Sequence, residues 1–160
     1  MLDKAKPVTR AELVNRIDRT PVYRVLLLAN LIGQPFFGRF GKRYGMTLNE
    51  WRIMMAIATN PGISVSEICL NTGLHIMNVS RGAAGLVRQG RAYRKTDPAD
   101  RRRKILDLTE EGEAVFRDIA PGGLAWADSV FSVLDEAETA EFDRLLAKMI
   151  DHINAGGDAS

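Results

Sequence analysis

The stretch RQGRAYRKTDPADRRRKILDLTEEG, residues 88–112, carries the signals that decide the fold. Residues 91–96 are predicted to form a strand, because they include aromatic and β-branched side chains. A proline and two aspartates at 97–100 are typical of a turn, since proline fixes its own φ angle and aspartate accepts hydrogen bonds from nearby backbone N–H groups. Polar and apolar residues alternate over 103–108 and predict a second strand. The stretch therefore predicts a β-hairpin.

The end of this stretch predicts the start of a helix. Thr109 is a favourable N-cap residue, and two glutamates follow it in the first turn, where the helix dipole stabilises negative charge. The alternation before it places Leu106 and Leu108 on one face of the second strand and Ile105 on the other. The hairpin is therefore expected to hold the basic residues of 101–104 away from the body of the protein.

Charge is distributed unevenly along the chain. Within residues 81–106, nine arginines and lysines stand against two aspartates, a net charge of +7, whereas residues 1–80 carry +5 and residues 107–160 carry −10. A solvated charged loop is the ordinary explanation of a basic turn. A concentration of positive charge on one element is instead typical of a protein that binds the phosphate backbone of a nucleic acid.

Most of the remaining chain is predicted to be helical. Four N-terminal capping signals are present: Thr9–Glu12, Thr47–Glu50, Ser64–Glu67 and Asp135–Glu138. Residues 22–40 are apolar on more than one face, so we expect this helix to be buried all round, most economically against a partner chain. Gly33 and Pro35 predict a kink within it.

Residues 64–89 have the pattern of a helix-turn-helix. A short helix is followed by a turn at Gly73 and by a second helix over 76–89, and the small Cys69 allows the two helices to approach. The second helix has an inward apolar stripe formed by Leu74, Val79, Ala83 and Leu86. A helix-turn-helix followed directly by a basic hairpin is a more specific signal than either motif alone.

Two motifs in these segments resemble the MarR (multiple antibiotic resistance regulator) family of winged-helix transcription factors. The hairpin is similar to the family's wing at Asp97-Pro98, Asp100, Arg102, Leu108-Thr109 and Gly112. The second helix is similar to the family's recognition helix, with the pattern LxxxxVSRxAxxL over 74–86. The resemblance covers almost the whole chain and is strongest over 47–112.

The resemblance implies an all-α fold with a small β-hairpin wing, in a single domain of residues 1–160. It implies a winged helix-turn-helix DNA-binding lobe at 47–112 and dimerisation through helices at 9–40 and 113–153. The expected function is that of a homodimeric, sequence-specific transcriptional regulator, a repressor rather than an activator. Two-fold symmetry predicts a pseudo-palindromic operator with half-sites about 10 bp, or a multiple of that, apart. A winged-helix dimer that binds protein, in an architectural or anti-regulatory role, is the alternative.

The DNA-binding candidates are outward residues of the recognition helix and polar residues of the wing. They are His75, Met77, Asn78, Ser80, Arg81, Arg88, Arg94, Lys95, Asp100, Arg101, Arg102 and Arg103. Ser80 and Arg81 are expected at base edges or phosphates, since arginine commonly reads guanine and serine can bond either type of edge. Arg102 is the expected contact at the wing tip, with Asp100 holding it by a paired hydrogen bond. Exposure without base contact remains the alternative for Met77 and Asn78, and solvated charge remains the alternative for the other wing cations.

The resemblance also implies an effector, because many family members release DNA when a small aromatic or phenolic molecule binds between the DNA lobe and the dimer helices. The candidate lining residues are Phe36, Tyr44, Trp51, Met54, Met55 and Trp126. Aromatic and methionine residues at helical spacing are more often part of a plain core, so that alternative stays open.

The chain departs from the family pattern at three places. The Pro-Gly-Gly at 121–123 interrupts a segment that is usually an unbroken helix, so a kink or a break is predicted there. Arg91 follows Gly90 where the family commonly has apolar residues. Gly82 and Gly85 lie inside the recognition helix, each at a cost of about 1 kcal/mol relative to alanine. They permit close approach either to DNA or to a neighbouring helix, and the sequence leaves both open.

Other classes of function find little support in the sequence. The two histidines, His75 and His152, and the single cysteine, Cys69, have no spacing typical of a nucleophilic or metal site, so we expect no enzyme, metal or cofactor. One cysteine permits a reducing compartment, and nothing adjacent to it indicates a redox sensor. No apolar run has the length of a membrane span and the first residues lack the apolar core of a signal peptide, so a cytoplasmic protein is expected.

Overall fold

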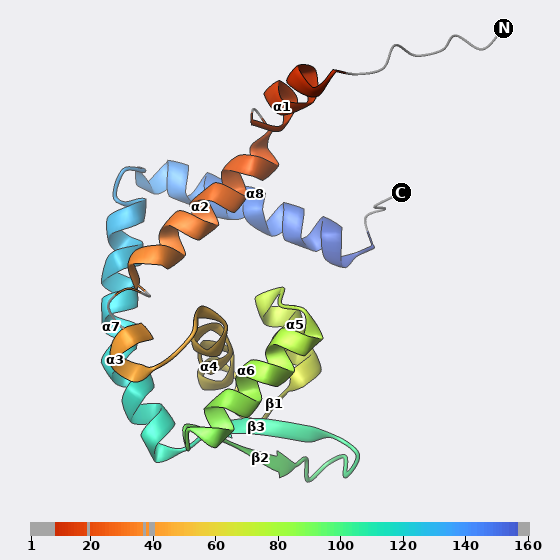
Figure 1. The fold of residues 1–160 in the computed structure, drawn as a ribbon, viewed down its shortest axis with the longest axis vertical. Helices are drawn as coiled ribbons and strands as arrows, with labels where there is room; N and C mark the ends of the chain where they lie inside the picture. Colours follow the sequence, from red (N-terminus) through yellow and green to blue (C-terminus); the bar gives the residue numbers. More distant parts are fainter. Residues whose placement is uncertain (1–8, 19, 37, 39–40, 157–160) are drawn as a thin grey trace, which may run out of the picture. The chain divides into compact units, whose positions relative to one another are not determined.

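The computed structural model describes residues 9–18, 20–36, 38 and 41–156 (Figure 1). It divides into two compact units, one ending at Ile119 and the other beginning at Ala120. The first unit holds α1 (Arg10–Asp18), α2 (Pro21–Phe36), α3 (Lys42–Tyr44), α4 (Leu48–Thr59), β1 (Ile63–Ser64), α5 (Val65–Thr72), α6 (Ile76–Arg88), β2 (Ala92–Thr96), β3 (Lys104–Leu108) and the first part of α7 (Glu110–Phe131). The second holds the rest of α7 and α8 (Glu136–Asn154). The predicted helical fold with a small β-hairpin is confirmed.

Helix starts follow the predicted capping signals. At α4, the Thr47 hydroxyl accepts a hydrogen bond from the backbone N–H of Glu50, and the Glu50 carboxylate accepts one in return from the backbone N–H of Thr47. The same reciprocal pair begins α1, α5 and α8. These bonds satisfy backbone donors that the first turn of a helix leaves unpaired, which is why a four-residue pattern predicts the boundary so well.

The sheet has three antiparallel strands in the order β1-β3-β2. Ile63 of β1 pairs with Leu106, and Ala92 of β2 pairs with Leu108. Because β3 is the central strand, apolar side chains on both of its faces are buried, including Ile105. The sequence did not predict β1, since a strand of two residues is too short to show alternation.

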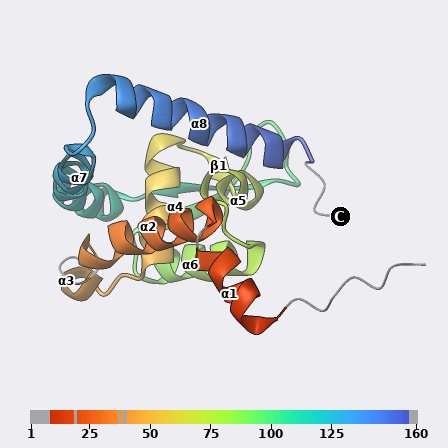
Figure 2. The ribbon, with the colours of Figure 1, turned by 90° about the horizontal axis from the view of Figure 1, so that it is seen from above.

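The core of the first unit is formed where α4, α5 and α6 pack on one another and on the sheet (Figures 1 and 2). Its fully buried side chains include Ile53 and Ile57 of α4, Ile68 of α5, Leu86 of α6 and Leu106 of β3. This core holds the helix-turn-helix and the hairpin in one rigid framework.

α7 is continuous from Glu110 to Phe131, so of the kink or break predicted at 121–123 the break does not occur. Pro121 cannot donate the hydrogen bond that would reach the carbonyl of Arg117, but the turns on either side keep their own bonds. α2 ends at Phe36, whereas the prediction extended this helix to about residue 40. Residues 37, 39 and 40 lie outside the described part of the chain.

Large apolar side chains are exposed on the first two helices and on α8. Those of α1 and α2 are Leu13, Val14, Ile17, Val22, Val25, Leu26, Leu27, Leu28 and Leu31. Those of α8 are Leu145, Met149, Ile150 and Ile153. The all-round burial predicted for the second helix is therefore not reached within one chain. Among the described helices, none has both the length and the apolar character needed to span a membrane.

Candidate nucleic-acid interface

α5 and α6 form the predicted helix-turn-helix. α5 ends at Thr72 and is capped by Gly73, whose φ of +66° favours glycine and whose N–H donates to the carbonyl of Cys69 at 2.9 Å. His75 begins α6, and its Nδ1 accepts a hydrogen bond from the backbone N–H of Met77 at 3.3 Å. His75 thus has a structural role at the start of α6, the predicted recognition helix.

α6 packs directly on α4 through its two internal glycines. A Cβ added at Gly82 would lie 2.5 Å from Cδ1 of Ile53, and one at Gly85 would lie 2.2 Å from Oε1 of Glu50. Real Cβ atoms do not approach other atoms so closely, so these glycines permit contact with the neighbouring helix. Glu50 is only 7% exposed and is held by its capping box and by the side-chain amide of Gln89, at 3.4 Å.

The opposite face of α6 is open to solvent. Its exposed residues include Met77, Asn78, Arg81, Ala84 and Arg88, and Ser80 is half-buried. With about 100° of rotation per residue, positions 77, 81, 84 and 88 fall into one stripe along the helix. The stripe therefore alternates apolar and cationic side chains, on a helix whose other side is fixed to the core.

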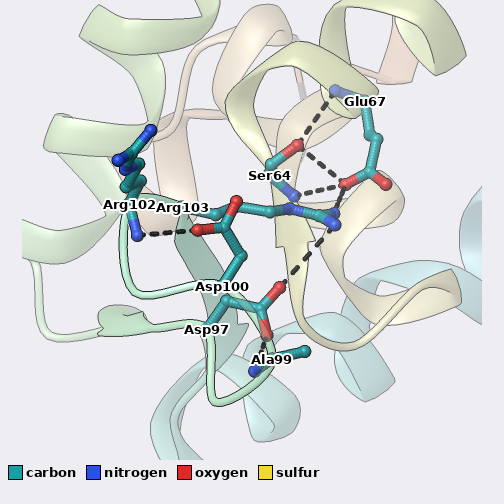
Figure 3. A network of polar contacts seen from close by, with 7 residues as sticks. All are labelled: Ser64, Glu67, Asp97, Ala99, Asp100, Arg102 and Arg103. Carbon is teal, nitrogen blue, oxygen red and sulfur yellow. Dashed lines mark hydrogen bonds and ion pairs between the residues drawn. The ribbon is translucent and has the colours of Figure 1, made fainter.

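The loop between β2 and β3 is held by aspartate side chains that cap its backbone (Figure 3). Asp97 accepts a hydrogen bond from the N–H of Ala99, and Asp100 accepts one from the N–H of Arg102, both at 2.9 Å. Asp100 therefore holds Arg102, as predicted, but through one hydrogen bond to the backbone rather than through the paired hydrogen bond that was expected. Because the aspartate bonds the backbone two residues on, the Arg102 side chain is left exposed.

Arg103 joins this loop, the wing tip, to the helix-turn-helix. Its guanidinium forms a hydrogen-bonded ion pair with Glu67 of α5 and lies 3.6 Å from the carboxylate of Asp97 (Figure 3). Glu67 also accepts hydrogen bonds from the backbone N–H and the hydroxyl of Ser64. The bonds from Ser64, followed by the bond from Arg103, lower the pKa of Glu67 to about 2. The sequence offered Arg103 as a DNA-binding candidate, with solvated charge as the alternative, and did not predict this ion pair, because the partner lies 36 residues away.

The cations of this region divide into two groups. Lys95 pairs with Asp107 at 3.0 Å, which raises the pKa of Lys95, and Lys104 donates to the hydroxyl of Thr96 at 2.6 Å. Other guanidinium groups have no carboxylate partner among the described residues: Arg81, Arg88, Arg94, Arg101 and Arg102. These five are exposed, lie on α6, β2 and the wing tip, and are available to an anionic ligand.

Arg91, a departure from the family pattern, is a clamp between segments of the first unit. It donates to the carbonyl of Tyr44 and to the side chain of Gln89, both at 2.7 Å. The hydroxyl of Tyr44 in turn donates to the carboxylate of Asp118, and this bond raises the pKa of Tyr44. A Cβ added at Gly112 would lie 1.9 Å from the Arg91 carbonyl oxygen, so α7 begins directly against this backbone.

The effector candidates are distributed over different environments. Trp51 and Met54 are buried in the core, and the Trp51 ring stacks on Phe116 with centroids 5.7 Å apart. Met55 lines a surface hollow of about 440 Å³, together with residues of α4 and α5. Tyr44 is part of the Arg91 clamp, Trp126 belongs to the second unit, and the side chain of Phe36 lies outside the described part of the structure.

Comparison with known proteins adds an independent view of this chain. Residues 44–103 match the sequence model of the MarR family. The chain is 30% identical over 108 residues to the transcriptional regulator HosA of Escherichia coli O111:H-, an alignment that covers 66% of this chain and 78% of HosA.

Two solved structures share the fold. A MarR/EmrR family transcriptional regulator from Acinetobacter sp. ADP1 superposes with a TM-score of 0.79 and 23% identity, covering 87% of this chain and 98% of that one. MepR of S. aureus, solved as a complex with DNA, superposes with a TM-score of 0.75 and 19% identity, covering 85% of this chain and 98% of MepR.

Proposed function

Since the chain belongs to the MarR family of transcriptional regulators, we propose that it is a repressor that binds a pseudo-palindromic operator as a homodimer. The observation that supports this most directly is the group of exposed guanidiniums at Arg81, Arg88, Arg94, Arg101 and Arg102, which have no carboxylate partner among the described residues. Unpaired arginines on a rigid helix and hairpin have the charge and geometry that phosphate binding requires.

In this proposal α6 enters the major groove. Its inner face is fixed against α4 by Gly82 and Gly85, so the outer stripe is presented without freedom to rotate. Arg81 is the proposed base-reading residue, because a guanidinium can bond O6 and N7 of guanine together. Ser80 is half-buried beside it, and we assign its hydroxyl to a base edge or a phosphate.

The wing provides the second contact. Arg101 and Arg102 lie on the loop whose backbone is held by Asp97 and Asp100, so their side chains extend from a fixed support. We assign them to phosphates or to the adjacent minor groove. Arg103 is assigned a positioning role, since its guanidinium is already paired with Glu67.

Dimerisation is proposed through the exposed apolar faces of α1, α2 and α8. Apolar surface of this extent on a soluble chain is typical of an interface. A dimer with two-fold symmetry would place two recognition helices on half-sites about 10 bp apart, or a multiple of that. MepR, which shares this fold, is known as a complex with DNA.

The proposal is tested by titrating fluorescently labelled DNA from upstream of the protein's own gene and following anisotropy, with scrambled DNA as competitor. Wild type is compared with Arg102→Ala and with Arg117→Ala, a matched loss of an exposed arginine on α7. We expect tight, competitor-resistant binding that falls steeply with salt. Arg102→Ala should weaken it about 10-fold or more, and Arg117→Ala should leave it within about 2-fold.

A negative result has a defined meaning. If the upstream DNA binds no better than scrambled DNA, selection from random sequence replaces it as the source of an operator. Failure of that selection as well would contradict the proposal and would favour the alternative, a winged-helix dimer that binds protein. Analytical ultracentrifugation at the same protein concentration tests the dimer separately.

We further propose that a small aromatic or phenolic molecule releases the DNA. Met55 and Tyr44 are the half-buried members of the candidate set in the first unit, so they are the side chains a ligand can reach without opening the core. Competition of a panel of phenolic acids against the labelled operator provides the test. A panel that leaves the anisotropy unchanged at millimolar concentration would count against this part of the proposal.

A further inference from the structure

The outer stripe of α6 contains one large apolar side chain, Met77, among its arginines. Met77 is 61% exposed, and it lies in the first turn of the helix, on the same stripe as Arg81 and Ala84. Its backbone is fixed, because its N–H donates to the His75 cap. A large apolar side chain held open to water at this place is available to a partner.

The position of Met77 selects among the groups that DNA can present. In a helix-turn-helix, N-terminal residues of the second helix contact base edges in the major groove. The apolar group in that groove is the C5-methyl of thymine, which the other three bases lack. Methionine suits such a contact, since its thioether is unbranched and adapts to the shape of a small apolar partner.

We infer that Met77 reads a thymine methyl group in each operator half-site, within two base-pair steps of the base read by Arg81. This inference rests on the proposed function. With a rise of 1.5 Å per residue, Met77 and Arg81 stand about 6 Å apart along the helix axis, a distance that spans about two base-pair steps of 3.4 Å. The thymine therefore lies within two steps of the guanine that Arg81 bonds.

The charges around Met77 favour DNA over a protein partner for this surface. Arg81 and Arg88 lie on the same stripe and have no carboxylate partner in the described structure, so the surface is cationic on the C-terminal side of Met77. Ile76, 51% exposed, is rotated by about 100° from Met77 and does not extend the stripe into a broad apolar patch. A single exposed methionine beside arginines is therefore suited to DNA, in which a thymine methyl group lies between negatively charged phosphates.

The test replaces each thymine of the selected operator, in turn, by deoxyuridine, which removes the methyl and keeps every hydrogen-bonding group. For wild type, substitution at one symmetric pair of positions should weaken binding about 4-fold per half-site, the value of one buried methyl group. Met77→Ala should bind the unmodified operator more weakly and should no longer distinguish thymine from deoxyuridine at that pair. Met77→Leu should restore the distinction, and Arg81→Ala should retain it while losing affinity.

Two kinds of negative result are distinguishable. If no deoxyuridine substitution changes wild-type affinity, or if the effect persists in Met77→Ala, the inference is overturned while the proposed function stands. If wild type selects no operator, the proposed function fails and this inference fails with it. Because Met77 is exposed, circular dichroism of Met77→Ala should match wild type, which confines the effect to DNA binding.

Discussion

Replacing Arg103 by alanine should separate the positioning of the wing from its contact with DNA. The substitution removes the ion pairs with Glu67 and Asp97 and leaves Arg101 and Arg102 in place. The side chains of Arg103 and Glu67 are 38% and 45% exposed, so solvent screens the pair substantially. At about 0.5–1 kcal/mol for each of the two pairs, we expect the free energy of unfolding to fall by about 1–2 kcal/mol.

The pKa of Glu67 gives a second route to the same contact. The pKa of this carboxyl is lowered from 4.5 to about 2. The hydrogen bonds from Ser64 are the largest cause, and the hydrogen bond from Arg103 comes next. A group with a depressed pKa contributes stability that is present above its unfolded value and is lost as the pH falls through its folded value. The Glu67 contribution is therefore complete above about pH 4.5 and is lost between pH 4.5 and pH 2. The penalty of Arg103→Ala should shrink over the same range.

Two assays distinguish a positioning residue from a phosphate contact. Urea unfolding at one fixed protein concentration measures the stability of wild type, Arg103→Ala and Glu67→Gln, at pH 7 and at pH 4. Anisotropy over a salt series measures DNA binding. The salt slope is the slope of the logarithm of the binding constant against the logarithm of the salt concentration. Arg102→Ala should reduce the magnitude of this slope by about 2 in a dimer, one for each lost phosphate contact. Arg103→Ala should leave the slope unchanged and lower the affinity modestly.

The reasoning would be refuted by either of two results. An Arg103→Ala variant with wild-type stability would mean that the ion pair does not hold the wing. A salt slope reduced as much as in Arg102→Ala would mean that Arg103 contacts phosphate directly, and that its pairing with Glu67 is exchanged on binding.

Two further predictions concern helix packing and titration. Gly85→Ala should lower the free energy of unfolding by about 1–3 kcal/mol in urea unfolding, because its Cβ would lie 2.2 Å from Glu50. Gly33→Ala is the control, since its Cβ would make an ordinary 3.5 Å contact, and equal effects at both positions would contradict the packing argument. Tyr44 has a raised pKa because it donates to Asp118, so its contribution to stability is present below about pH 10 and lost as the pH rises further. In an absorbance titration at alkaline pH, Tyr44→Phe should remove one tyrosine ionisation that lies above the ordinary tyrosine pKa. A titration curve that keeps this ionisation in the variant would exclude the assignment.

Arg91 shows how a departure from a family pattern can acquire a structural role. An apolar residue is common at this position, and here a guanidinium bonds the Tyr44 carbonyl and the Gln89 side chain. Gln89 lies 3.4 Å from Glu50, so the start of α4, the end of α6 and α3 are joined through one chain of polar contacts. The sequence marks Arg91 as unusual, but its partners follow only from the packing of the first unit.

Short sequence patterns predicted the structural features that depend on hydrogen bonds or spacing between residues a few positions apart. Each capping pair is three residues apart, and the Asp97 and Asp100 bonds in the wing reach two residues on, so the helix starts and the wing turn were predictable from the sequence. The inward stripe of α6 was predictable because helical periodicity depends only on spacing. Of the kink or break expected at Pro121, the break does not occur, since a helix with intact turns on both sides tolerates one missing hydrogen bond.

Tertiary structure alone decided the features that join distant residues. The Glu67–Arg103 pair spans 36 residues and the Tyr44–Arg91 contact spans 47, so no local pattern separates these arginines from exposed ones such as Arg102. The glycines of α6 are a similar case, since only the position of Glu50 and Ile53 shows that α4, rather than DNA, makes the close approach. The amino-acid sequence determined which segments form helices and where positive charge gathers. The packing of those segments determined which of the charges are already paired and which are left for a ligand, because pairing depends on distances that only the folded chain defines.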